Sequence, residues 1–474
     1  MAKVLVMGAG VGGLSTAMVL ALDGHDVTVV ERDPAPAPRD PEDAWASWER
    51  RGVNQFRLPH FLLARWRQEA EREIPDAVAA LEERGALRMN PVEVLPAELT
   101  GGVRDGDEVF TSVTARRPVV EAALTATAEA IPGVSVRRGV AVEGLLTSGS
   151  SRAVPHVVGL RAGGGEELRA DLVVDATGRR SPLPVWLAAL GAPAPVEERE
   201  DCGFVYYGRH YQADEMPELR AGALTHYDSA SILTLAADNG TWSVVFCCSA
   251  RDAAMRGLRD PDRFEAALDH YPVAAHWKDG KPITGVDVMA RIEDRYRRLV
   301  VDGAPVVTGL VAVADAWACT NPSLGRGISI GLLHACALRD LLRETSPSAG
   351  ARGTDADDFA RRWDETTEAT VGPLYRATLA FDRHRLAEID AEIAGRPYET
   401  DDRAWAVSKA LYAGSGRDPE VLRASLRIAG LLATPSEVVA EPGMVDRILA
   451  AAAGRPRYAL PGADRATLVA TVTD

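Results

Sequence analysis

The feature that most constrains the fold is a cluster of glycines close to the N-terminus. Gly8-Ala9-Gly10-Val11-Gly12-Gly13 stands between two apolar segments, Lys3–Met7 and Gly12–Leu22. The first segment predicts a buried parallel strand, and the periodicity of the second predicts a helix. Asp26–Glu31 predicts a second strand. The chain therefore opens with a βαβ unit, which indicates an α/β fold with a parallel sheet.

In such a unit the glycines have a chemical use. They allow a tight turn and let a pyrophosphate reach the N–H groups at the helix N-terminus, whose dipole favours negative charge. Glu31 ends the second strand, where its carboxylate can accept hydrogen bonds from a ribose. The predicted dinucleotide contacts here are Gly8, Gly10, Gly12, Gly13, Glu31 and the adjacent Arg32. This motif does not distinguish FAD from NAD.

Beyond this unit the chain alternates between regular and irregular stretches. Residues 32–58 are rich in proline and charge, which predicts a surface excursion without regular structure at its start. Helical periodicity follows over 61–84, and 118–131 predicts a helix with proline at its first position. A second, antiparallel layer with a hairpin turn at Asp238-Asn239-Gly240 is predicted by the strands 204–211, 231–237 and 241–248.

The last third of the chain first returns to the nucleotide-binding fold. The apolar segment 305–314 predicts a buried strand that leads into a helix at 327–343. A polar linker, 346–357, is followed by a largely helical stretch to about 453 and a loose tail. The predicted division is therefore a nucleotide-binding part at 1–195, a β-rich substrate-binding part at 196–300, a second nucleotide-binding part at 301–345 and a helical C-terminal region at 346–474.

Charge and cysteine usage exclude several classes of partner. The net charge of −15 repels phosphate backbones and anionic lipids, so neither nucleic acid nor a membrane surface is expected as a partner. No run of about 18 uncharged apolar residues predicts a spanning helix. Met1–Val30 lacks the unbroken apolar region of a signal peptide. Five cysteines without CxxC spacing predict no disulfide framework, no metal site and a cytoplasmic location.

Two later motifs favour FAD. Leu172–Gly178 is a strand that runs into a turn with Asp175 and Gly178, and a second strand precedes Asp315 and a Pro-x-x-Gly-x-Gly turn. With these motifs, in this order over residues 3–343, the sequence resembles the p-hydroxybenzoate-hydroxylase-like family of FAD monooxygenases. The resemblance implies an α/β fold of Rossmann-like FAD-binding type, with an inserted antiparallel β-sheet substrate domain and a helical C-terminal region.

The resemblance also implies roles for individual residues. Asp315 would bind the ribityl chain of FAD, and Arg117 resembles the arginine that opens a helix in the family and reaches the cofactor. Ala314 departs from the family, which usually has glycine before the aspartate, and Trp317-Ala318-Cys319 replaces its common Ala-His. The residues that would lie at the cofactor from the later motifs are Asp175, Gly178, Pro322, Gly325, Arg326 and Gly327.

Two segments are similar to the bacterial polyene and polyether epoxidase branch of the family, Gln55–Leu62 and Asn321–Gly327. In the family, reduced flavin takes up O₂ as a C4a-hydroperoxide, which transfers one oxygen atom to an electron-rich carbon. The resemblance implies an epoxidase or hydroxylase of secondary metabolism that acts on a small, largely apolar organic substrate, with NAD(P)H or a partner flavin reductase as electron donor. The candidate catalytic residues are Arg57, His60, Tyr207 and His210.

Alternatives remain open at this point. Reductases of the geranylgeranyl-reductase type have the same three motifs without oxygen transfer, and a flavoprotein can hold FAD without turning anything over. A disulfide reductase is not indicated, because no CxxxxC follows the glycine motif, and a flavin halogenase is not indicated, because no Trp-x-Trp-x-Ile-Pro segment appears. Aromatic residues of the β-layer alternate between two faces, so a subset of them can face the substrate.

Overall fold

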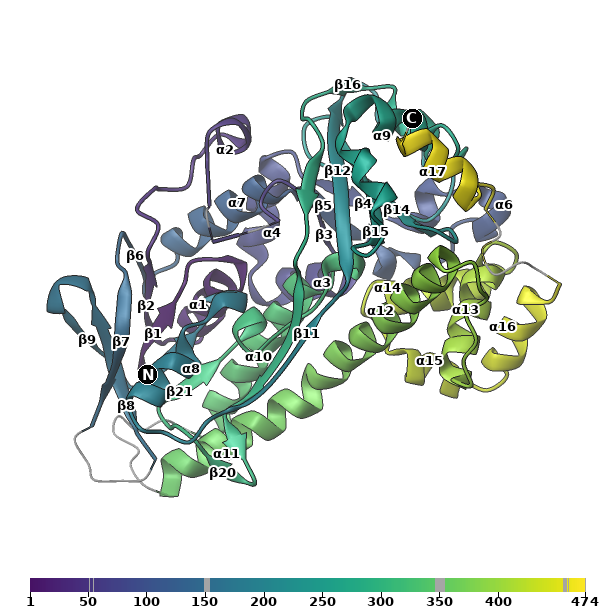
Figure 1. Ribbon diagram of the computed structural model, residues 1–474. Helices are drawn as coiled ribbons and strands as arrows, with labels where there is room; N and C mark the ends of the chain where they lie inside the picture. The colour runs from purple at the N-terminus through teal and green to yellow at the C-terminus, as the bar shows by residue number, and fades with distance from the viewer. Residues whose placement is uncertain are drawn as a thin grey trace.

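A parallel sheet of five strands organises the N-terminal part of the molecule (Figure 1). The computed structural model describes residues 1–50, 52–53, 55–148, 154–345, 354–454, 458 and 460–473. The strand order is β21-β10-β1-β2-β6, and every neighbouring pair runs in parallel, so the carboxyl ends share one edge. The strands are β1 (Lys3–Met7), β2 (Asp26–Glu31), β6 (Val134–Arg138), β10 (Leu172–Asp175) and β21 (Leu310–Ala312).

Different layers cover the two faces of this sheet. Val4 and Val6 of β1 pack into a core with helices, whereas Leu5 and Met7 pack into a core with an antiparallel β-layer and one helix. Burial of both faces explains the unbroken apolar run of β1. The first layer is α1 (Val11–Leu22), α7 (Arg117–Ala130) and α10 (Gly327–Thr345); the second is β7 (Val142–Thr147), β8 (Val157–Ala162), β9 (Glu167–Arg169) and α8 (Leu183–Ala189).

The second large sheet is antiparallel and has six strands. The predicted hairpin joins two of them, and Asn239 and Gly240 have φ of 55° and 67°, the left-handed conformation of such turns. One face packs on α9 (Pro261–Leu268) and the C-terminal α17 (Arg465–Thr473). The strands are β12 (Phe204–Gln212), β13 (Leu224–His226), β14 (Ser231–Ala236), β15 (Thr241–Ser249), β16 (Lys281–Pro282) and β17 (Asp287–Met289).

A buried ion pair locks this sheet to the first half of the molecule. Asp238, in the hairpin turn, accepts hydrogen bonds from the backbone N–H, Nε and guanidinium of Arg116 at 2.6, 3.0 and 2.6 Å, and both side chains are fully buried. Arg116 ends one of the smaller strands. These strands are β3 (Pro59–Leu62), β4 (Leu87–Met89), β5 (Ser112–Arg116), β11 (Val196–Asp201), β18 (Glu293–Arg298), β19 (Val300–Val301), β20 (Ala304–Pro305) and β22 (Ala318–Cys319).

The C-terminal region is built on one long helix. In Figure 1, α12 runs from α11, beside the parallel sheet, to the group α13–α16, while α17 returns to lie by α9. None of the described helices combines the length and hydropathy that crossing a membrane requires. The helices are α11 (Thr354–Thr370), α12 (Gly372–Ile393), α13 (Arg403–Ser415), α14 (Pro419–Ala429), α15 (Pro435–Ala440) and α16 (Met444–Ala452).

The predictions for 32–84 were wrong in part. The excursion contains a short helix, α2 (Pro41–Ala46), because Asp40 accepts hydrogen bonds from two N–H groups of its first turn. The predicted helix at 61–84 is a strand, β3, followed by α3 (Ala64–Glu73) and α4 (Pro75–Glu83). Pro75 has no N–H to continue a helix, so it begins a new one. Two short helices follow, α5 (Pro91–Val94) and α6 (Ala97–Thr100).

Three predictions in the second half also need correction. The strand expected at 305–314 is divided into β20 and β21, with Gly309 at a φ of 71° between them. Residues 346–353 of the predicted linker lie outside the described residues, and its last four residues already belong to α11. The tail ends in a helix, α17, because Leu468 and Val472 lie four residues apart and are fully buried in the core of the second sheet.

Candidate functional site

One large cavity lies at the carboxyl edge of the parallel sheet. Its volume is about 2400 Å³, whereas ordinary small-molecule sites hold roughly 300–1,000 Å³. Its wall runs from the glycine turn before α1, past the second sheet, to helices α13 and α14. The space is large enough for a dinucleotide and a second molecule side by side.

The glycine turn leaves backbone donors free at the start of α1. Gly10 is the N-cap, no side chain caps this helix, and no acidic residue stands in its first turn. A Cβ built on Gly10 would meet nothing within 4 Å, because this side faces the cavity. Gly13 instead allows close packing, since its Cβ would come within 1.9 Å of the carbonyl oxygen of Gly8. Gly8 and Gly12 also line the cavity.

Four buried charges lie beside this turn. Glu31 accepts hydrogen bonds from the N–H of Ala9 and the guanidinium of Arg50, both at 2.9 Å. Arg50 also donates to Glu121 at 2.9 Å, and Glu121 accepts a bond from Nε of Arg117 at 2.8 Å. Each arginine thus has a carboxylate partner, and Glu31, Arg50 and Arg117 line the cavity. No spacing rule marks Arg50 in the sequence, so sequence analysis missed it.

Asp175 does not line the cavity but shapes a turn that does. Its carboxylate accepts hydrogen bonds from the N–H and hydroxyl of Thr177, at 3.0 and 2.6 Å, and from the hydroxyl of Ser181. These bonds hold the turn that carries Gly178, which lines the cavity with a φ of 77°. Arg32, at the end of β2, is another lining residue.

Asp315 offers a free acceptor to the cavity. Its carboxylate lines the cavity and accepts no hydrogen bond from any residue that the structure describes. Burial raises the pKa of Asp315, and the nearby Arg117 and Arg179 oppose that shift. A buried carboxylate without donors is costly, so the site favours a ligand that brings hydroxyl groups. Arg179 also lines the cavity and had no signal in the sequence.

The turn after Asp315 brings a second helix N-terminus to the cavity. Gly325 has a φ of 64° and α10 begins at Gly327, with no acidic residue in its first turn. A Cβ built on Gly325 would lie 3.8 Å from the carbonyl oxygen of Phe61, so β3 packs against this side of the turn at ordinary contact distance. The lining residues of this turn include Pro322, Gly325, Arg326 and Gly327.

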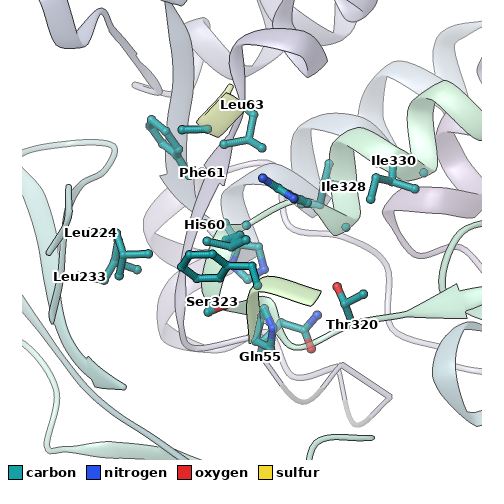
Figure 2. A pocket seen from close by; sticks show the side chains of 18 of the residues that line it. Gln55, His60, Phe61, Leu63, Leu224, Leu233, Thr320, Ser323, Ile328 and Ile330 are labelled. Carbon is teal, nitrogen blue, oxygen red and sulfur yellow. The ribbon is translucent and has the colours of Figure 1, made fainter. Parts of the chain in front are cut away.

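Of the four candidate catalytic residues, His60 lines the cavity. Its Nδ1–H donates to the carbonyl oxygen of Leu58 at 2.9 Å, which leaves Nε2 as a hydrogen-bond acceptor. Burial, together with the charge of Arg117, holds the pKa of His60 well below its usual value, so the ring is neutral. In Figure 2, two leucines of the second sheet lie to one side of His60 and two isoleucines of α10 to the other.

The other three candidates lie away from the cavity wall. The ring of His210 packs on Trp45 at 4.9 Å, and the guanidinium of Arg57 lies 5.0 Å from the same indole. Tyr207 points into the core on the α9 face of the second sheet. Successive side chains of a strand point to opposite faces, so the neighbouring Tyr206 faces the cavity. The hydroxyl of Tyr206 donates a hydrogen bond to Asn321.

A metal ion has no prepared site in the part of the chain that the structure describes. The one group of three ligand-type side chains found there is Glu69, Glu73 and Cys336. Arg72 pairs with Glu69 and Arg339 pairs with Glu73, so the carboxylates are already neutralised.

The fold and this site define an FAD-dependent oxidoreductase. The uncapped N-terminus of α1 suits the diphosphate of FAD, and the carboxylate of Asp315, without a donor among the described residues, suits its ribityl hydroxyls. The glycine turn at Gly325 lines the cavity and leaves room there for a flat ring. Residues 3–40 also match the family described as FAD dependent oxidoreductase. FAD as the cofactor, predicted from the three motifs, is therefore confirmed.

Similar proteins cover most of the chain. Protein Rv3254 of Mycobacterium tuberculosis is 28% identical over 411 residues, or 81% of each chain. PqsL of Pseudomonas aeruginosa, a probable FAD-dependent monooxygenase, has a TM-score of 0.56 and 17% identity, and the match covers 82% of this chain and 99% of PqsL. A flavoprotein/dehydrogenase of Cytophaga hutchinsonii has a TM-score of 0.59 and 16% identity over 95% and 97% of the two chains. These structures confirm the predicted fold.

Proposed function

We propose that this protein is an FAD-dependent monooxygenase, an epoxidase or hydroxylase, that transfers one atom of O₂ to a small, largely apolar organic substrate. The observation that carries the proposal is the continuity of the cavity. The residues that fit FAD and the apolar wall of the second sheet enclose one space of about 2400 Å³. Bound FAD would supply the electrons and the activation of O₂.

The chain itself would bind the substrate, orient it and exclude water from it. The substrate would lie near His60, between the side chains of the second sheet and those of α10 (Figure 2). This apolar wall keeps water from the reacting atoms. The residues that form it include Phe61, Leu63, Leu224, Leu233, Ile328 and Ile330.

Two charge effects support catalysis in this geometry. The N-terminus of α10 directs its positive dipole end at the cavity, which favours negative charge on the flavin ring. His60 is neutral, so its Nε2 can accept a hydrogen bond from a hydroxyl group of a substrate and orient it. Its lowered pKa makes it a weak base, which suits an epoxidation better than a hydroxylation that needs a base to deprotonate a phenol.

The electron donor is proposed to be NAD(P)H or a partner flavin reductase. The sequence has no second GxGxxG motif after Gly8–Gly13, so any nicotinamide would bind transiently. All five cysteines are buried and unpaired, which favours the reducing cytoplasm as the location.

The test measures oxygen transfer directly. The FAD-loaded protein is mixed with NADH or NADPH, with and without a general flavin reductase, under ¹⁸O₂ and in the presence of candidate aromatic and polyene compounds. We expect O₂ uptake and one ¹⁸O atom in the product, detected by mass spectrometry. A product formed equally well without O₂ would identify a reductase instead. A flavin that no donor reduces would identify a protein that holds FAD without catalysis.

A further inference from the structure

Among the described residues, Arg326 is the buried arginine that lacks a carboxylate partner. Nine arginines are buried among the residues that the structure describes. Eight of them have a carboxylate oxygen within 4.0 Å, and Arg326 has none. The eight paired arginines are Arg50, Arg116, Arg117, Arg295, Arg297, Arg339, Arg385 and Arg423.

The partners of Arg326 are neutral. Its guanidinium donates to Oγ1 of Thr378 on α12 at 3.0 Å and to the carbonyl oxygen of Ile428 on α14 at 3.5 Å. Its Nε is buried without a hydrogen-bond partner among the described residues. Burial lowers the pKa of Arg326, yet a guanidinium stays charged in proteins. An unpaired buried cation destabilises the folded protein, so an anion that binds beside Arg326 would be favoured.

The nearby carboxyl group does not supply the missing charge. Asp382 is buried on α12 and accepts a hydrogen bond from the hydroxyl of Ser323 at 2.7 Å. Burial raises the pKa of Asp382 to about 7, and Asp294 acts in the same direction, whereas the hydrogen bonds from Ser323 and Asn321 and the charge of Arg326 oppose the shift. No carboxylate oxygen of Asp382 lies within 4.0 Å of a guanidinium nitrogen of Arg326, so the two described side chains form no ion pair. Arg326, unlike Asp382, lines the cavity.

Aromatic side chains of α12 and α13 line the same cavity, and Phe381 follows Thr378, the partner of Arg326, by three residues on α12. Tyr412 of α13 interacts electrostatically with Arg326, and burial raises the pKa of its phenol to about 12, so the hydroxyl keeps its proton. That hydroxyl has no partner among the described residues. The ring of Tyr412 lies 5.0 Å from that of His226 and 5.9 Å from that of Phe381, and Phe381 lies 5.6 Å from Trp405. All of these rings line the cavity.

We propose that Arg326 and the hydroxyl of Tyr412 bind a carboxylate of the substrate, and that the adjoining rings hold a flat aromatic or polyene body. The substrate class is thus an apolar aromatic or polyene carboxylic acid. A carboxylate supplies the counter-charge that the guanidinium lacks and accepts hydrogen bonds from both groups. The rings provide stacking surfaces for a flat apolar molecule. This inference rests on the proposed function, since it assigns the substrate of the same cavity.

The competing role for Arg326 is a contact with the flavin, as the resemblance implies. The two hydrogen bonds of its guanidinium instead lead to α12 and α14, in the C-terminal region. The side chains that fit the diphosphate and ribose of FAD lie at the start of α1, at the end of β2 and beside α7, whereas Asp315 and Gly325 face the cavity from the segment before α10. The guanidinium therefore belongs to the substrate end of the cavity.

The test compares acids with their esters on the FAD-loaded protein. The probes are cis-parinaric acid and anthracene-9-carboxylic acid, each with its methyl ester, and binding is measured by probe fluorescence without any turnover. We expect the wild-type protein to bind each acid at least about tenfold more tightly than its ester, because a hydrogen bond to a charged group is lost in the ester. Arg326→Met should abolish this preference, and Arg326→Lys should retain part of it.

Two further variants separate binding from packing. Tyr412→Phe removes one hydroxyl and should weaken acid binding while ester binding stays unchanged. Thr378→Val removes the neutral partner of Arg326 but keeps its charge, so the preference for acids should survive. Because the cation is unpaired, the melting temperature of Arg326→Met without probe should equal or exceed that of the wild-type protein.

Two outcomes would overturn the inference. One is a wild-type protein that binds neither acid more tightly than its ester. The other is an Arg326→Met variant that keeps the preference for acids but loses FAD or shows a shifted flavin potential. Neither outcome contradicts the proposed function. The proposed function is contradicted instead if the flavin cannot be reduced or if no oxygen is transferred.

Discussion

At the scale of single residues, Ala314 explains how the chain departs from the family motif and still forms the turn. Its φ is 49°, a left-handed conformation that costs a residue with a Cβ about 1–2 kcal/mol. The Cβ fits because glycines face it. A Cβ built on Gly12 would lie 2.8 Å from the Cβ of Ala314, and one built on Gly331 would lie 3.2 Å from it.

This contact predicts the effect of a paired substitution. Gly12→Ala should destabilise the protein by about 1–3 kcal/mol and weaken FAD binding, because the new Cβ overlaps that of Ala314. Ala314→Gly in the same chain should restore both, since it removes the opposing atom and the left-handed alanine. FAD titration and thermal unfolding of the single and double variants provide the measurement. A double variant that is no more stable than Gly12→Ala and binds FAD no more tightly would show that the two side chains are not in contact.

At the scale of elements, the first turns of α7 join the cavity to the surface excursion. Arg117 and Glu121 lie one turn apart, and Glu121 is fully buried between Arg117 and Arg50. Glu31 and Asp33 also pair with Arg50, so both arginines are compensated by carboxylates of the protein. The excursion is thereby held against the cofactor site, although its composition alone predicted a surface segment.

Removing the charge of Glu121 should therefore unbalance this group. We expect Glu121→Gln to lower the free energy of unfolding by about 3 kcal/mol, because Arg117 would lose the one carboxylate that pairs with it among the described residues, while Arg50 would keep Glu31 and Asp33. Added FAD should raise the melting temperature more in this variant than in the wild-type protein, since its diphosphate supplies negative charge beside the arginines. Glu129→Gln, at a half-exposed position of the same helix, is the control. Equal shifts in both variants would mean that the arginines do not face the diphosphate.

At the scale of the whole molecule, the two ends of the C-terminal region close different parts of the structure. Helices α13 and α14 close the cavity. Helix α17 passes back to the second sheet, where Leu468 and Val472 enter its core and Arg465 pairs with Asp252 at 2.6 Å. The second sheet is therefore closed by the last helix of the chain.

This closure predicts a stability effect far from the cofactor. Leu468→Ala should lower the free energy of unfolding by about 2–5 kcal/mol, because it leaves a void in a fully buried core. FAD affinity should stay unchanged, since α17 does not line the cavity. Leu449→Ala, which changes a leucine of α16 that is 48% exposed, serves as the matched control in chemical denaturation. A loss no larger than in the control would show that α17 does not close the core.

Local patterns were enough to predict the parts of the fold that local physics decides. Glycine spacing marked the turn before α1 because the backbone there needs a positive φ at Gly8 and close packing at Gly13. The hairpin turn at Asp238–Gly240 could be predicted because asparagine and glycine readily adopt the left-handed conformation that such turns require. The break at Pro75 and the helix α17 were missed, the first because periodicity continued across the proline and the second because prolines dominated the tail.

The sequence by itself determined the FAD-binding fold and most residues that line the end of the cavity proposed for the cofactor, because motifs of consecutive residues place them at the edge of the parallel sheet. Tertiary structure decided the rest. Arg50, Tyr412 and the missing counter-charge of Arg326 depend on segments far apart in the chain, and no spacing rule joins them. Strand alternation left open which tyrosine faces the cavity until packing on α9 directed Tyr207 away from it. Burial and charge balance are properties of the assembled molecule, so they appear only once the elements are packed.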